Sequence, residues 1–128
     1  MTSTTQETPA GALAHDPPDL ETMRATVARL LGPDGGPEAL PPAAGEVDML
    51  TRMMRGQLEL LIPDVERLVG GRTKNVSQYC ALACIGEARG KLSAEPLPGL
   101  SGAVAYARRL SRVLAALCDH YENLGGAS

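Results

Sequence analysis

The densest group of reactive side chains in this 128-residue chain is the run Cys-Asp-His-Tyr-Glu at 118–122. Within it, His120 is suited to act as a general base oriented by a neighbouring carboxylate, with Cys118 as a nucleophile. Glu87 is the third candidate for such a site. The alternative is a solvated helix end, where the helix dipole favours a protonated histidine. Spacing alone fixes no geometry here, so we favour the non-catalytic interpretation.

The three cysteines raise the question of a metal centre. Cys80 and Cys84 are four residues apart, a spacing that can supply two ligands from one helix face but is too wide for a disulfide. Cys118 and His120 could complete a four-ligand zinc shell. However, residues two apart on a helix point in nearly opposite directions, so these two do not readily face one ion. Cysteines flanked by apolar residues are typical of a core, and we expect neither a metal nor a cofactor.

Glu87 has several candidate partners of opposite charge. The favoured arrangement is a partly buried Glu–Arg pair between two helices, which fixes their register more reliably than it adds stability. The alternative is an arginine pocket that binds an anionic ligand. The candidate arginines are Arg89, Arg108, Arg109 and Arg112.

Two C-terminal helices are expected to position these candidates. In Asn75–Leu92, the run Tyr79–Ile85 is apolar all round, so we expect this helix to be the central and most buried one. In Leu100–Leu124, apolar residues spaced three and four apart lie on one stripe of a helix. That stripe consists of Leu100, Ala103, Ala107, Leu110, Leu114, Leu117, Tyr121 and Leu124.

Two further helices precede these. The first begins at 16–19, where Asp-Pro-Pro-Asp suits a helix start, and stops at Gly32. The next runs from Glu46 to Val69 and contains Pro63, which predicts a kink or two shorter helices that meet there. Residues that widen its apolar face, and so predict contact with two neighbours, are Met53, Leu60 and Ile62.

The expected fold class is therefore all-α: a small bundle of about four helices, with the second helix kinked at Pro63. We expect a single helical domain at 16–126, with its core at 46–126. The first helix and a Pro/Gly-rich connector occupy 16–45 of that domain. Residues 1–15, which consist mostly of Thr, Ser, Gln, Ala, Gly and Pro with scattered charge, are expected to be a flexible tail.

Composition argues against several classes of function. The chain has no Phe or Trp, so a large aromatic-lined ligand pocket is not expected. Residues 1–45 carry six acids and two bases, and residues 46–128 carry nine acids and ten bases, so neither part has the basic excess that nucleic-acid binding needs. No secretion signal or membrane-spanning run is visible. An odd number of cysteines without an export signal favours a cytoplasmic location.

Four motifs stand out in residues 46–126: Leu60-Leu61-Ile62-Pro63-x-Val65-Glu66, Cys80–Arg89, Ala107-Arg108-Arg109-Leu110 and Leu117–Leu124. In this order they resemble a family of short actinobacterial proteins labelled "natural product biosynthesis" proteins, which have a domain of unknown function. The resemblance implies a cytoplasmic protein linked to secondary metabolism, and it implies no catalytic residues. The preference for Arg over Lys, ten to two, is typical of a GC-rich actinobacterial genome.

The expected function is a non-catalytic accessory or regulatory role that depends on binding a protein partner, with a small molecule as a second kind of ligand. The alternative is a small cofactor-free enzyme or ligand-binding protein that uses Glu87, Cys118 and His120. Val104, Val113 and Cys118 add apolar surface beside the stripe of the last helix, which predicts a homodimer through the second and fourth helices. The other arrangement is a monomer whose first helix covers that surface.

Overall fold

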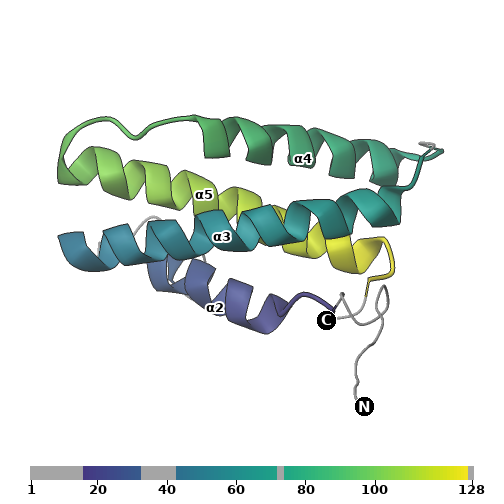
Figure 1. Ribbon diagram of the computed structural model, residues 1–128, viewed down its shortest axis with the longest axis horizontal. Coiled ribbons are helices and arrows are strands. Elements are labelled where there is room, and N and C mark those ends of the chain that lie inside the picture. The colour runs from purple at the N-terminus through teal and green to yellow at the C-terminus, as the bar shows by residue number, and fades with distance from the viewer. Residues whose placement is uncertain (1–15, 33–42, 72–73, 127–128) are drawn as a thin grey trace, which may run out of the picture.

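The computed structural model of the chain describes residues 16–32, 43–71 and 74–126. Four helices and no strand make up this part of the chain, and consecutive helices run in opposite directions (Figure 1). The predicted all-α bundle is confirmed. Residues 1–15 and most of the connector lie outside the described residues. None of the four helices is long and apolar enough to cross a membrane. They are α2 (Leu20–Leu31), α3 (Ala44–Val69), α4 (Val76–Ser93) and α5 (Gly99–Asn123).

Side chains cap the starts of α2 and α4. The Asp19 carboxylate accepts the backbone N–H of Thr22 at 3.0 Å and the Thr22 hydroxyl at 2.6 Å. Asn75 accepts the backbone N–H of Gln78 at 2.9 Å, and the Gln78 side chain accepts the N–H of Lys74 at 2.6 Å. These bonds satisfy backbone donors that have no partner within the helix, so they fix where each helix begins.

Helix α3 runs uninterrupted with Pro63 inside it, so the prediction of two shorter helices is wrong. Proline removes one backbone hydrogen bond and its ring pushes against the preceding turn. Pro63 lies on the exposed side of α3, whereas Leu61 and Val65 on either side of it are fully buried. Their burial holds the helix together across the missing hydrogen bond.

Helix α5, and not α4, is at the centre of the bundle. Among the described helices, α5 packs against all three others, whereas α4 packs only against α3 and α5. In Figure 1, α4 and α2 lie on opposite sides of the pair formed by α3 and α5. Eleven residues of α5 are buried, against four of α4. The expectation that the segment Asn75–Leu92 is the most buried helix is therefore wrong.

The reason is that an apolar run does not show which of its sides a neighbour covers. Tyr79 and Leu82, both in the apolar run of α4, are 62% and 40% exposed. Only one side of α4 faces α3 and α5, because α4 lies at the edge of the bundle. The buried residues accordingly form a single stripe, spaced three and four apart: Ala81, Cys84, Ile85 and Ala88.

A polar network joins three helices at the end of α4. Arg55 of α3 donates from Nη1 to the Tyr106 hydroxyl of α5, and from Nη2 to the Leu92 carbonyl at 2.7 Å. The Tyr106 hydroxyl donates to the Lys91 carbonyl at 2.7 Å. The last carbonyls of a helix lack their usual partner four residues on. The Lys91 carbonyl also accepts the backbone N–H of Ala94 at 3.2 Å, and Arg55 and Tyr106 add side-chain donors at this end of α4.

Candidate functional site

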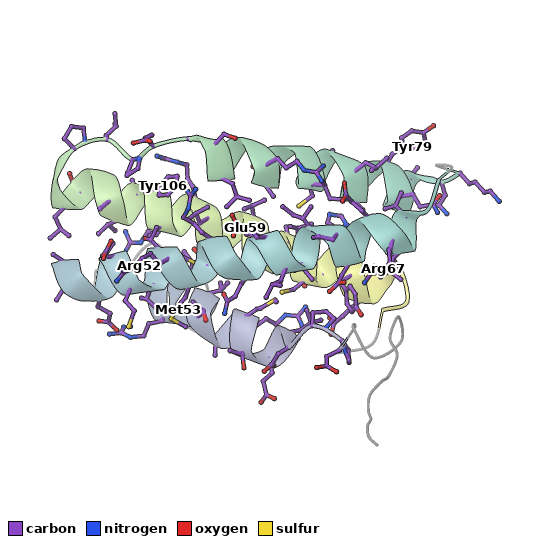
Figure 2. All side chains as sticks on the ribbon, viewed as in Figure 1. Arg52, Met53, Glu59, Arg67, Tyr79 and Tyr106 are labelled. Carbon is purple, nitrogen blue, oxygen red and sulfur yellow. The ribbon has the colours of Figure 1, made fainter. Side chains whose placement is uncertain are left out.

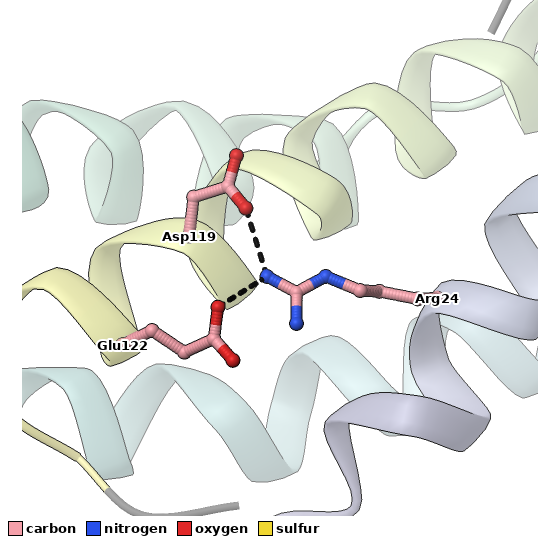
Figure 3. Close-up of polar contacts among 3 residues, drawn as sticks. All are labelled: Arg24, Asp119 and Glu122. Atoms are coloured by element: carbon pink, nitrogen blue, oxygen red, sulfur yellow. Dashed lines mark hydrogen bonds and ion pairs between the residues drawn. The ribbon is translucent and has the colours of Figure 1, made fainter. Parts of the chain in front are cut away.

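An arginine of α2 binds the acidic residues near the end of α5. Nη2 of Arg24 donates to Oδ1 of Asp119 and to Oε1 of Glu122, each at 2.8 Å (Figure 3). The hydrogen bond from Arg24 lowers the pKa of the Glu122 carboxyl, and the bonds to Glu122 and Asp119 raise the pKa of Arg24. The carboxylates that could have oriented His120 are therefore bound to Arg24.

Cys118 is unsuited to act as a nucleophile. It is fully buried, and burial raises its pKa to about 11, although the charge of Arg24 acts in the opposite direction. The thiolate is the reactive form of cysteine, and at neutral pH this side chain is a thiol. His120 is half-buried in the last turn of α5, while Glu87 is exposed on α4.

Two depressions in the surface contain none of these three candidates. The larger, of about 530 Å³, lies between the start of α2 and the middle of α3. Met23, Leu60 and Pro63 contribute to its largely apolar wall, and Asp16 and Glu59 add carboxylates. The smaller, of about 300 Å³, lies between the starts of α3 and α5. The alternative enzyme site is thus not assembled in either depression.

The three cysteines also lie in different surroundings. Cys80 is exposed, whereas Cys84 and Cys118 are buried, and all three are free. The Cys84 Sγ lies 4.0 Å from the Val113 carbonyl, and burial, with a smaller effect of Glu87, raises the Cys84 pKa to about 11. Within residues 16–32, 43–71 and 74–126, no group of three or more His, Cys, Asp or Glu is placed to hold a metal ion.

The expected pair between Glu87 and an arginine is not found. Arg89 instead donates to Glu66 of α3 at 2.6 Å, and so joins α4 to α3. Glu87 takes part in none of the ion pairs between described residues. Neither depression is the expected arginine pocket, because Arg108, Arg109 and Arg112 do not line them.

An exposed apolar stripe runs along α3. Met49, Met53 and Leu60 are 46%, 41% and 70% exposed, and Figure 2 shows Met53 on the side of α3 away from α4. Gly56 and Pro63 continue the same spacing of three and four, so the five residues share one side of the helix. A Cβ built at Gly56 meets no atom within 4 Å, so the middle of the stripe is open. These five residues are called the α3 stripe below.

Two further expectations about apolar surface are corrected by these positions. Of the residues expected to widen the buried face of α3, Ile62 is buried, but Met53 and Leu60 are exposed. Their outward position was missed because the sequence does not show that the three helices in contact with α3 leave one of its sides uncovered. The surface expected for a dimer on α5 is inside the subunit, since Val104 and Val113 are 7% and 3% exposed.

The chain matches a known protein family. Residues 21–126 match a family described as "Family of unknown function (DUF6415)". The match therefore extends from the first turn of α2 to just beyond α5, across the whole bundle. No curated protein and no solved structure matches the chain.

Proposed function

We propose that this chain, which belongs to the DUF6415 family of unknown function, is a non-catalytic accessory or regulatory protein that acts by binding a protein partner. The observation that carries this proposal is the α3 stripe. It is a continuous apolar surface on a helix whose opposite side is fully packed, so the bundle needs no further burial there to fold. Exposed apolar surface of this kind is typical of binding sites for other proteins.

The partner that fits the α3 stripe best is an amphipathic helix. The stripe extends over about four turns of α3, from Met49 to Pro63, as a helix-in-groove contact requires. Met49 and Met53 supply flexible, polarisable side chains that adapt to the surface of a partner. Gly56 lets a side chain of the partner approach the backbone of α3.

The charge beside the stripe predicts a further property of the partner. At its Leu60 end the α3 stripe enters the larger depression, where Asp16 and Glu59 are exposed. Neither of these two carboxylates takes part in an ion pair between described residues. We therefore expect the partner helix to carry a lysine or arginine at the end that reaches this depression.

We further propose a cytoplasmic role in actinobacterial secondary metabolism. The support is the resemblance of the motifs in residues 46–126, the preference for arginine over lysine, and the three cysteines. The burial and high pKa of Cys118 support a role that does not depend on a cysteine nucleophile.

Leu60→Glu tests the proposed function, and Leu97→Glu is its matched control. Both leucines are exposed to the same degree, 70% and 71%, but Leu97 lies outside the α3 stripe. Each form is used as bait in an extract of the native host, and bound proteins and small molecules are identified by mass spectrometry. A specific partner is expected with the wild type and with Leu97→Glu, and is expected to be lost with Leu60→Glu. If the proteins bound by the two variants do not differ, the α3 stripe is not the binding surface.

A further inference from the structure

The outer side of α4 is an exposed face with a single charge. Val76 is 75% exposed and Tyr79 62%, and Figure 2 shows Tyr79 projecting away from the other helices. None of the described helices packs on this side, because α4 contacts only α3 and α5. Seven exposed residues recur there every three or four positions, opposite the buried stripe, and are called the outer α4 face: Val76, Tyr79, Cys80, Ala83, Gly86, Glu87 and Gly90.

Two glycines on the outer α4 face have open space beside them in the part of the chain that the structure describes. A glycine inside a helix is destabilising relative to alanine, because it loses more conformational freedom on folding. Such a glycine is explained when another backbone or side chain approaches it closely. A Cβ built at Gly86 or Gly90 meets no atom within 4 Å. No described residue occupies the space beside these glycines, so a second molecule can enter it.

We propose that the outer α4 face packs against the same face of a second copy of this chain, with the two α4 helices antiparallel about a two-fold axis at Ala83. Residues at equal distances before and after Ala83 then face each other across the interface. Val76 faces the partner's Gly90, and Cys80 faces the partner's Gly86. The larger side chains of the first half of α4 thus fill the space left by the glycines of the second half.

The antiparallel pairing also matches the polar groups. Tyr79 faces the partner's Glu87, so its hydroxyl is placed to donate to the one carboxylate of α4. Each Glu87 lies beside the first half of the partner's helix, whose N-terminus is the positive end of the helix dipole. A parallel pairing would place Glu87 beside the partner's Glu87 and glycine beside glycine, with like charges together and the gaps unfilled.

This dimer goes beyond the proposed function and is independent of it, because it uses α4 and not the α3 stripe. A single helix face of about four turns makes a small interface, at the low end of those found in specific complexes. We therefore expect a reversible dimer that forms in the micromolar range and above. Both surfaces can be occupied together, so failure of one leaves the other in place.

Gly86→Leu tests the dimer, and Gly56→Leu is its matched control. Each variant adds a leucine where a helix-interior glycine has open space around its Cβ, the first on α4 and the second on α3. Sedimentation equilibrium up to about 500 µM is expected to show wild type and Gly56→Leu rising from 13.4 kDa towards twice that mass. Gly86→Leu is expected to weaken the dimer at least tenfold. Leucine favours a helix over glycine, so circular dichroism melts are expected to show both variants at least as stable as the wild type.

Three outcomes of this experiment would overturn the inference. The first is a wild type that stays at 13.4 kDa across the whole concentration range. The second is a Gly86→Leu variant that dimerises as tightly as the wild type. The third is a dimer that Gly56→Leu disrupts and Gly86→Leu does not, which would place the interface on α3.

Cross-linking tests the antiparallel register. In a Cys80→Ser background the remaining cysteines, Cys84 and Cys118, are buried. Ala83→Cys then places one thiol from each copy at the two-fold axis, and mild oxidation is expected to give a covalent dimer. Val76→Cys lies about 21 Å from its counterpart along the helix axis and is expected to stay uncrosslinked. A covalent dimer from Val76→Cys, or none from Ala83→Cys, would contradict the antiparallel pairing.

Discussion

Arg24 brings together groups that lie 95 and 98 residues apart in the chain, Asp119 and Glu122. All three side chains are more than a third exposed, so solvent screens the two ion pairs and their contribution to stability is small. The contact instead restricts how α2 can lie on α5, because a single guanidinium nitrogen must be within hydrogen-bond distance of two carboxylates on the same face of α5. It therefore fixes where α2 lies along the end of α5.

Removing this contact is expected to have a pH-dependent effect. Arg24 holds the folded-state pKa of Glu122 below its ordinary value of 4.5, so the contact contributes stability above that pH and loses it as the pH falls through the lower folded value. The difference in urea midpoint between wild type and Arg24→Met is thus expected to be present at pH 7 and to shrink below pH 4.5. A difference that grows on acidification would contradict this account.

The cysteines are expected to differ sharply in reactivity. Burial raises the pKa of Cys84 and Cys118 to about 11, which leaves both protonated and shielded at about pH 8. A thiol reagent is therefore expected to modify only Cys80 in the folded protein, and all three after unfolding. Cys80→Ser is expected to leave the folded protein unreactive. Rapid modification of Cys118 in that variant would reopen the case for a nucleophile.

At the scale of the helices, the end of α4 depends on a side chain from α5. Tyr106→Phe removes the hydroxyl that bonds the Lys91 carbonyl and accepts from Arg55, in a site that is 2% exposed. The Lys91 carbonyl keeps the backbone N–H of Ala94 as a donor, but Arg55 loses its acceptor at a buried site, so the free energy of unfolding is expected to fall by about 1–3 kcal/mol. Tyr79→Phe makes the same chemical change at an exposed position, and its effect is expected to stay within about 0.5 kcal/mol. Urea unfolding of the two variants checks both values.

The two sides of α4 are expected to respond differently to truncation. Ile85 is 2% exposed, and Ile85→Ala is expected to lower the free energy of unfolding by about 2–5 kcal/mol, because it leaves a cavity against the core. Leu82→Ala removes a side chain of equal size that is 40% exposed, and a loss below about 1 kcal/mol is expected. Equal losses from the two variants would mean that the side of α4 that faces the bundle is assigned wrongly.

The helices themselves could be predicted from the sequence, but which of their faces are covered could not. In α5, the apolar residues spaced three and four apart are buried from Ala107 to Tyr121. A regular apolar stripe indicates which side of a helix faces the core, so this face could be predicted. In α4, apolar residues lie on every side of the helix, so the pattern does not indicate which side faces the core. Tyr79, which belongs to that apolar run, is on the surface. The residues next to Arg24 in the sequence do not indicate that it binds α5, because its partner Asp119 lies 95 residues further along the chain.

At the scale of the whole molecule, the packing of the other helices on α5 is expected to make unfolding a single cooperative transition. Every other described helix packs on α5, and its leucines are in one continuous core with those of α2 and α3. Loss of helicity in urea, followed by circular dichroism, is therefore expected to coincide with exposure of the Cys84 and Cys118 thiols. Leu114→Ala, at a fully buried position of α5, is expected to shift both transitions together by about 2–5 kcal/mol. Two separated transitions would show that part of the bundle opens independently.

Helix α2 is the earliest of the four described helices in the chain, but it packs more extensively on α5, the last, than on α3. A ribosome therefore releases α2 well before its binding surface exists. With 12 residues it is too short to be a stable helix alone in water. Met23, Val27 and Leu30 are then uncovered in the nascent chain until α5 has been translated, and this segment is where a chaperone that scans emerging polypeptides has the longest time to bind.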